Sequence, residues 1–266
     1  MKFNAKISIE SVDYAFFNKL KLNKVYVEDQ YGDTLLYSGK IYTSLRGYNL
    51  KKRFISIGTA ELNTGKFYLR QDSTGVLNLK FIIDALSSKD TTKKKKEYSF
   101  KVRNFKLVDF AFKYRKWKPR VKPYGMNYTD LDIRHINLDL RNIRIVGPKI
   151  LAKMENLSAY EKCGFLLKRL NADVDFSPKE IKLSNTTINT QSSRVKASYI
   201  IFRFNGFSDW KDYVHKVKMD ALFNNAFVDF KTISYFAPTL RKWNFKGYLD
   251  GRVRGPVCNL RSDYLS

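Results

Sequence analysis

The chain has 266 residues, and 50 lysines and arginines against 25 aspartates and glutamates give it a formal net charge of +25. With 44% hydrophobic and 15% aromatic residues it is too apolar to be a disordered polycation. No apolar run approaches the roughly 18–20 residues of a membrane-spanning helix, and the first residues lack the apolar stretch of a secretion signal. Composition therefore predicts a folded chain that is long enough to bury a core.

Cysteine and histidine counts exclude several kinds of site. The only cysteines are Cys163 and Cys258, and the only histidines are His135 and His215. These are too few for a disulfide framework or a cysteine-rich zinc site, and glycine-rich phosphate-binding or hydrolase motifs are absent from the sequence. We therefore expect two isolated thiols, no metal, no cofactor and no enzymatic activity.

The first part of the chain alternates apolar and polar residues, beginning with Phe3, Ala5, Ile7 and Ile9, as strands with one buried face do. Ser11 is a candidate N-cap for a short helix over residues 12–20, and further short helices are expected over 79–86, 208–214 and 233–237. Residues 87–97 include four consecutive lysines and predict a basic mobile loop. The loop suggests a first sheet segment over 1–86 and a second over 98–266, or one sheet that continues past the loop.

Long alternating segments dominate the rest of the chain, above all residues 98–115 and 128–146. Their apolar phase slips from even to odd positions and back, with breaks at His135 and near Asn142. Such slips predict β-bulges that bend a long strand. Shorter alternating segments follow over 170–176, 217–223 and 243–253.

Strands with one apolar face must hide that face in a sandwich, a barrel or a strongly curved sheet. Long, bulged strands favour the last of these, so we predict a mainly β chain. We expect an elongated, strongly curled, groove-like and mostly antiparallel sheet with a few short helices. An exposed apolar trough implies a ligand or partner. The alternative that these apolar faces form an ordinary buried core stays open. The candidate groove-lining residues are Phe100, Val102, Leu107, Phe110, Phe112, Leu138, Leu140, Val174 and Phe176.

Several segments resemble, in the same order, the amino-terminal part of TamB-type proteins of the AsmA superfamily, whose translocation and assembly modules serve the bacterial envelope. The resemblance covers nearly the whole chain. These are framework patterns and not catalytic motifs. The segments are KVYVEDQYGDTLLYSGKIYTS (24–44), IGTAELNTGKFYLRQDSTGVLNLKFIIDAL (57–86), YGMNYTDLDIRHINLDLRNIRI (124–145), LSAYEKCGFLLKRLNADVDFSPKEIKLSNTTINT (157–190), YFAPTLRKW (235–243) and GYLDGRVRGPVCNLR (247–261).

The resemblance implies a periplasmic β-groove protein in the envelope of double-membraned bacteria. Such proteins are associated with phospholipid transport between membranes, outer membrane biogenesis and protein secretion. The resemblance also implies three partners: phospholipid acyl chains, the membrane surface and an outer-membrane barrel protein of the BamA/TamA type. Family members also have an inner-membrane anchor helix and a large carboxy-terminal domain, so we expect this chain to be an amino-terminal portion without either.

Two alternatives stay open. Within the same family, the sheet edges would guide outer-membrane proteins during assembly. From a different class, the charge of +25 favours nucleic acid, and the mixed aromatic and basic run over 112–118 is a candidate stacking platform.

The remaining polar signals have plainer interpretations. The carboxylate pairs Asp130/Asp132 and Asp173/Asp175 lie near Arg134 and Arg169, so we expect charge pairing and not acid–base catalysis. His135 falls at a phase slip and is expected at a bulge.

Overall fold

The computed structural model describes residues 6–15, 19–49, 54–86 and 99–265, and the described part is mainly β. The expected basic loop over 87–97 lies outside these residues. The strands are β1 (Ile7–Ser8), β2 (Ser11–Ala15), β3 (Lys19–Glu28), β4 (Thr34–Asn49), β5 (Phe54–Arg70), β6 (Ser99–Arg115), β7 (Asp130–Val146), β8 (Lys149–Glu161), β9 (Leu166–Ser177), β10 (Glu180–Thr190), β11 (Arg194–Arg203), β12 (Lys218–Asp229), β13 (Lys246–Pro256) and β14 (Arg261–Leu265). The helices are α1 (Lys80–Leu86), α2 (Tyr213–Lys216) and α3 (Phe230–Ser234), with 3₁₀ turns η1 (Phe207–Asp212), η2 (Pro238–Lys242) and η3 (Val257–Asn259).

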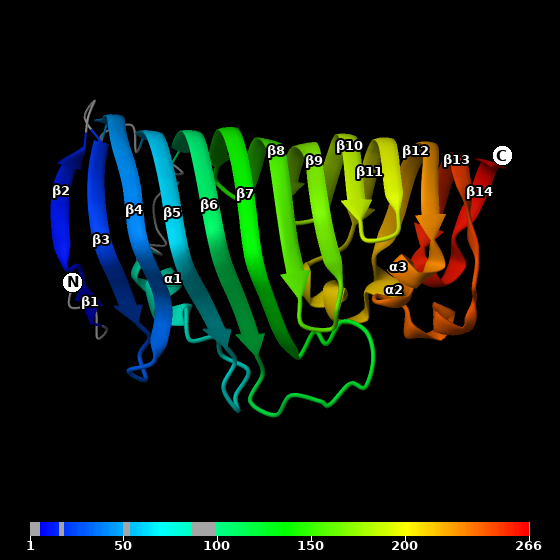
Figure 1. The fold of residues 1–266 in the computed structure, drawn as a ribbon, viewed down its shortest axis with the longest axis horizontal. Coiled ribbons are helices and arrows are strands. Elements are labelled where there is room, and N and C mark those ends of the chain that lie inside the picture. Colours follow the sequence, from blue (N-terminus) through cyan, green and yellow to red (C-terminus); the bar gives the residue numbers. More distant parts are fainter. Residues whose placement is uncertain (1–5, 16–18, 50–53, 87–98, 266) are drawn as a thin grey trace, which may run out of the picture.

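All 14 strands belong to one sheet whose order follows the sequence, and Figure 1 shows them side by side from blue to red. The path runs from β1 and β3 to β14, with β2 also paired to β3, and the sheet is not closed. Neighbouring strands are antiparallel except β5 and β6, which are parallel from the pair Phe54/Ser99 to the pair Arg70/Arg115. The sheet is therefore continuous between the two segments expected on either side of residues 87–97.

Bulges occur where the sequence predicted phase slips. Asp109, His135 and Asn142 have positive φ values of 49°, 52° and 53°, and β6, β7 and β8 shift register around them. A left-handed residue inserts one extra position, so the apolar side chains return to the same face beyond it. The prediction that His135 is a bulge residue is confirmed.

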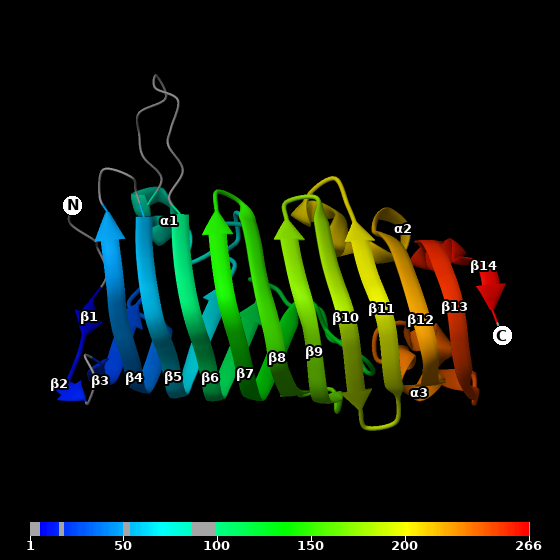
Figure 2. The ribbon, with the colours of Figure 1, turned by 90° about the horizontal axis from the view of Figure 1, so that it is seen from above.

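Three of the positive-φ positions are aligned across the sheet, with Gly39 completing the line. Lys24 and Thr64 also have positive φ values, 44° and 48°, and the flanking register places Lys24, Gly39, Thr64 and Asp109 opposite one another on β3 to β6. Because the extra residue falls at the same level in each strand, pairing continues beyond it without a mismatch. Figures 1 and 2 view the sheet from directions at 90° to each other and both show the strands lengthwise, so the strands bend.

The helices confirm three expectations and correct one. Helical turns form at α1, at η1 with α2, and at α3, close to the predicted ranges. The helix expected over 12–20 is wrong: Ser11–Ala15 is strand β2, and Val12 pairs with Leu22 of β3. Spacings of four residues also satisfy the period of two of a strand, and the ladder to β3 decides between them.

The connection from β6 to β7 reaches far along the sheet. In Figure 1 it passes below the ends of β8 to β11 toward α3. The Met126 amide donates to the Tyr235 carbonyl at 2.7 Å, and the Tyr124 hydroxyl lies 2.6 Å from the Ser234 hydroxyl. Gly125, with φ 77°, passes so close to Tyr235 that a β-carbon there would lie 2.7 Å from the carbonyl oxygen. This loop therefore fixes α3 relative to β7, through contacts such as Tyr124–Ser234 between residues 110 positions apart in the chain.

Candidate functional site

One apolar row crosses nine consecutive strands. Each member is the register partner of the next, so all point to the same face of the sheet. We call it the central row: Leu22, Ile41, Leu62, Leu107, Leu138, Leu157, Leu170, Ile188 and Val195, from β3 to β11. The predicted residues Leu107 and Leu138 are adjacent in it.

A second apolar row runs parallel to the first across β5 to β12. We call it the aromatic row: Ile55, Phe100, Ile145, Ile150, Phe176, Ile181, Phe202 and Met219. It contains two more predicted residues, Phe100 and Phe176, which come from strands 76 positions apart in the sequence.

The other predicted residues also have apolar register partners. Val102 pairs with Ile57 and Ile143, and Val174 pairs with Ala152 and Leu183.

Leu140 and Phe112 lie in the same kind of environment. Leu140 pairs with Phe105 and Met154. Phe112 pairs with Ile133, and its ring is stacked on Phe67 with centroids 6.3 Å apart.

Phe110 differs in burial from the other candidates. It pairs with Ile136 and Gly65, and its ring is only 5% exposed. The structure therefore places this ring inside the sheet packing, next to a glycine on the neighbouring strand.

The two rows are incompletely covered. Thirteen hydrophobic side chains among the described residues are buried, and none of them belongs to the central or the aromatic row. The compact cluster lies instead at β11 and β12, around Ala197, Ile200 and Ala221. Half-buried side chains in continuous rows leave apolar surface accessible along the sheet.

Helical segments cover part of this surface. Trp210 of η1 makes edge-to-face contacts with Phe202 of the aromatic row and with Phe204, with centroids 5.8 and 5.5 Å apart. The Trp210 indole nitrogen is buried and has no hydrogen-bond partner. In Figure 1, α1 lies behind β4 to β6.

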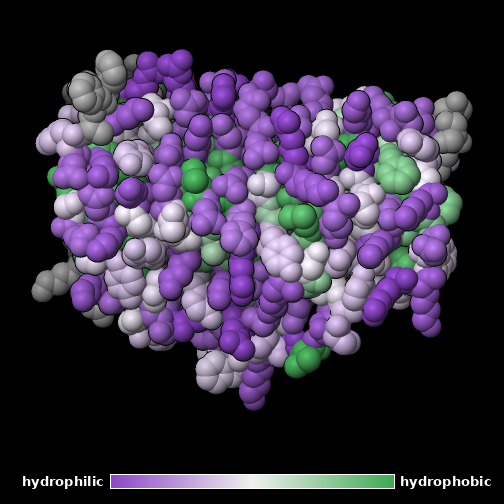
Figure 3. Space-filling model, in the orientation of Figure 1, coloured by the Kyte–Doolittle hydropathy of each residue, from purple (hydrophilic) through white to green (hydrophobic). Residues whose placement is uncertain are grey.

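The opposite face is charged, and several of its cations are paired with carboxylates. Lys106 lies 3.6 Å from Asp139, Lys113 3.4 Å from Asp132, and Lys149 3.3 Å from Asp175. Figure 3, in the orientation of Figure 1, shows a mostly hydrophilic surface.

The predicted carboxylate pairs follow this pattern. Asp132 accepts two hydrogen bonds from Arg134, at 2.9 and 2.7 Å, and these bonds hold the pKa of Asp132 below its usual value. Asp130 pairs with Lys162 at 2.6 Å, and Asp173 accepts from Asn185 at 2.7 Å. Charge pairing is confirmed for Asp130 and Asp132, although Asp132 is buried and not at a wet surface. Charge pairing is also confirmed for Asp175, with Lys149 at 3.3 Å, but among the described residues Arg169 forms no ion pair with Asp173 or Asp175.

The run over 112–118 is divided between the two faces. Phe112 and Tyr114 lie half-buried on the apolar side, whereas Lys113 and Arg115 pair with Asp132 and Asp130 at 3.4 and 3.8 Å. Trp117, 64% exposed, lies beyond the end of β6. The run therefore does not form a single surface of alternating rings and free cations.

The remaining titratable residues form no cluster of the kind that holds a metal ion. Within the described ranges, groups of three or more histidine, cysteine and carboxylate side chains do not occur. His135 lies 2.9 Å from Asp109, and Cys163 and Cys258 are both free thiols. The helices among the described residues are all too short or too polar to cross a membrane.

Neither a scan against protein-family models nor a search of the curated proteins finds a match to this chain.

Most members of the central row were not among the candidates chosen from the sequence. Leu22, Ile41, Leu62, Leu157 and Ile188 belong to alternating segments that carry the same signal as 98–115. Alternation identifies the face of each strand, whereas the register that joins the strands into a row depends on the pairing.

Proposed function

We propose that this chain is a non-enzymatic protein that holds phospholipid acyl chains along its apolar sheet face, with the sheet curled around them as a groove. The central row supports this proposal most strongly. It joins nine strands through apolar side chains, and none of these side chains is buried.

The row has dimensions that suit an acyl chain. Eight inter-strand spacings of about 4.8 Å give a length of roughly 38 Å. One leaflet contributes half of the approximately 30 Å hydrocarbon core of a bilayer, or about 15 Å. An acyl chain would therefore fit at several overlapping positions along the row.

Binding of this kind depends on shelter from water and not on polar contacts. Each methylene removed from water contributes about 0.8 kcal/mol, so a bound acyl chain is held firmly. Because leucine, isoleucine and valine recur at every strand, movement by one strand exchanges one apolar contact for a similar one. A lipid would therefore move along the row with small changes in free energy.

The resemblance to TamB-type proteins supports an envelope setting for this activity. On that basis we propose a periplasmic location and a role in lipid transport and outer-membrane protein assembly. An outer-membrane barrel protein of the BamA/TamA type would be the partner.

Lipid is a better candidate than nucleic acid because of the cations on and beside the run over 112–118, the stacking platform that the sequence suggested. Nucleic-acid binding needs lysines and arginines that are available to phosphates. Here Lys106, Lys113 and Arg115 already face carboxylates across the polar side of the sheet.

The proposal is tested with two neighbouring residues on opposite faces. Leu107 belongs to the central row, whereas Val108 is 41% exposed and pairs with the polar Asn63. After purification without detergent, native mass spectrometry should detect phospholipid bound to the wild-type chain. Leu107→Glu should reduce the bound lipid several-fold, because a carboxylate in the row is poorly solvated, and Val108→Glu should leave it unchanged.

A second measurement does not depend on a buried charge. A photoreactive benzoylphenylalanine in place of Leu107 should form lipid adducts, and the same group in place of Val108 should not. A lipid-free wild-type chain, or equal crosslinking from both positions, would contradict the proposal.

A further inference from the structure

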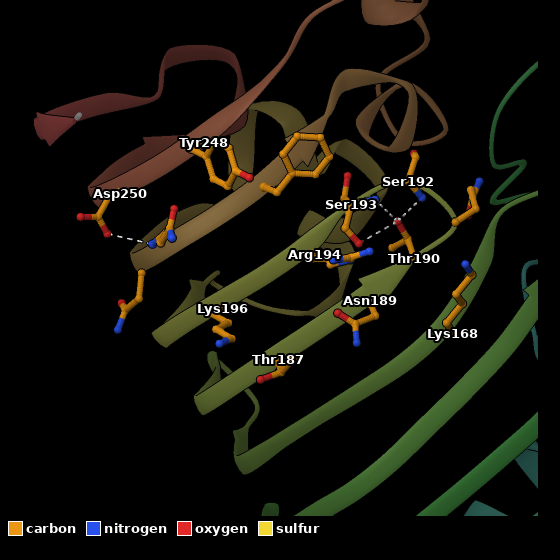
Figure 4. Close-up of a pocket in the computed structure, with 14 residues that line it drawn as sticks. Lys168, Thr187, Asn189, Thr190, Ser192, Ser193, Arg194, Lys196, Tyr248 and Asp250 are labelled. Carbon is orange, nitrogen blue, oxygen red and sulfur yellow. Dashed lines mark hydrogen bonds between the residues drawn. The ribbon is translucent and has the colours of Figure 1, made fainter.

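A second recess lies on the polar face, away from the apolar rows. It has a volume of about 1140 Å³ and is bounded by β9 to β13 near the β10–β11 turn (Figure 4). Lys168, Arg194 and Lys196 lie along one side, and Tyr248 and Asp250 lie on the other.

A bulge between β11 and β12 accompanies the recess. Arg194 pairs with Phe227 and Ala197 pairs with Phe223, so β12 has one residue more than β11 over this interval. The extra position is next to Asn225, which has a positive φ of 48°. A bulge bends its strand, so the two strands part locally and leave space on the polar face.

The three cations of the recess have no carboxylate partner among the described residues. Several other cations on this face are paired, as Arg203 is with Glu180 at 2.9 Å. The one carboxylate of the recess wall, Asp250, accepts a hydrogen bond from the Asn225 amide at 2.9 Å. The wall therefore has an excess of two positive charges that face no fixed anion.

The rest of the wall is suited to a hydroxylated ligand. Asn189 and Thr187 lie between the cations, as the register partners of Arg194 and Lys196. Tyr248 is 67% exposed, and its ring packs against Phe227 with centroids 5.4 Å apart. Amide and hydroxyl groups bind ligand hydroxyls, and an exposed ring offers a flat apolar surface.

The rim of the recess is held in place by hydroxyl groups. Thr232 at the start of α3 lies 3.1 Å from the Thr190 hydroxyl, 2.9 Å from that of Ser192 and 2.8 Å from that of Ser193. The β10–β11 turn is thus tied to α3, so the site is formed before a ligand arrives.

We propose that this recess binds a phosphorylated, polyhydroxylated ligand of sugar size. Arg194 and Lys196 are two residues apart on one strand and hold the phosphate, with the guanidinium as a bidentate donor. Lys168 lies two strands away, about 10 Å from them, and contacts a different part of the ligand. The ligand is either a free sugar phosphate or the phosphorylated polyol headgroup of a lipid. Because the recess and the apolar rows lie on opposite faces, this proposal is independent of the proposed groove.

Isothermal titration calorimetry with glucose 6-phosphate, inorganic phosphate and glucose tests the site. Glucose 6-phosphate should bind at least about tenfold more tightly than either of the others, since it engages both the cations and the amides. Arg194→Gln with Lys196→Gln should remove this binding. The matched control is Arg144→Gln with Lys179→Gln, two exposed cations outside the recess, which should leave it intact.

Vesicles distinguish the two sources of the ligand. Phosphatidylcholine vesicles that contain phosphatidylinositol should bind more tightly than plain vesicles, in an Arg194- and Lys196-dependent manner, if the headgroup is the source. Unchanged vesicle binding together with glucose 6-phosphate binding identifies a soluble ligand. The proposal is overturned if no probe binds, if inorganic phosphate binds as tightly as the sugar phosphate, or if a single-stranded oligonucleotide binds more tightly with a steep salt dependence.

Discussion

The ring of Phe110 on β6 lies directly over the backbone of Gly65 on the parallel neighbour β5. A β-carbon at Gly65 would collide with this ring and with the carbonyl oxygen of Tyr37. The glycine thus allows an aromatic side chain to be buried against the neighbouring strand of the sheet.

Gly65→Ala should therefore lower the free energy of unfolding by about 2 kcal/mol, because the ring and the backbone must both shift. Urea denaturation followed by circular dichroism measures the change. Gly47→Ala on β4 is the control, since a β-carbon there meets no atom within 4 Å. Equal stability of the two variants would show that the contact at Gly65 is not limiting.

Thr64, one residue earlier, has a branched side chain at a φ of 48°. A β-branched residue is strained in this left-handed region, whereas glycine is not. We expect Thr64→Gly to raise the free energy of unfolding by about 0.5–1 kcal/mol. Thr59→Gly, in extended backbone of the same strand, should lower it by a similar amount. A loss of stability in both variants would contradict the role of Thr64 in the aligned bulge.

Asp220 on β12 accepts hydrogen bonds from Arg252 at 2.9 and 2.8 Å, with Arg203 3.6 Å away. These contacts hold the pKa of Asp220 below its usual value. The carboxylate therefore stabilises the fold at neutral pH, and this contribution is lost as the pH falls from about 5 through the lowered pKa.

Asp220→Asn should reduce stability at pH 7 by about 2 kcal/mol, less than for a fully buried pair because the Arg252 side chain is 40% exposed. It should also flatten the dependence of stability on pH between 5 and 3. The exposed Asp175 provides the comparison, and Asp175→Asn should change the urea midpoint little at either pH. A wild-type pH profile in the Asp220 variant would contradict the assignment.

Cys163 and Cys258 should differ in reactivity. Burial raises the pKa of the Cys163 thiol to about 11, so it is almost entirely protonated at pH 8, whereas Cys258 is exposed. Since the thiolate is the reactive form, iodoacetamide should label Cys258 first, and the rate at Cys163 should rise up to about pH 11. Peptide mass spectrometry gives both rates. In the urea-unfolded chain the two cysteines should react at similar rates. Similar rates for Cys163 and Cys258 in the folded chain as well would contradict the burial of Cys163.

Long strands were predictable because their signal is local. Alternation over residues 98–115 and 128–146 corresponds closely to β6 and β7, and the slips at His135 and Asn142 appear as left-handed residues. The residues near Val12 were misassigned because a spacing of four residues suits both a helix and a strand. Only the pairing of Val12 with Leu22 resolves that ambiguity.

The order of the amino acids is enough to establish which face of each strand is apolar, because side-chain direction alternates along an extended backbone whatever the neighbouring strand is. The tertiary structure alone decided which of the apolar side chains meet. The register places Leu22 and Val195, 173 positions apart, in one row, and it brings Lys168 to the same recess as Arg194. Register depends on the hydrogen bonds between strands and on the alignment of their bulges. If the pairing of one strand shifted by one residue, each of its side chains would move to the opposite face of the sheet.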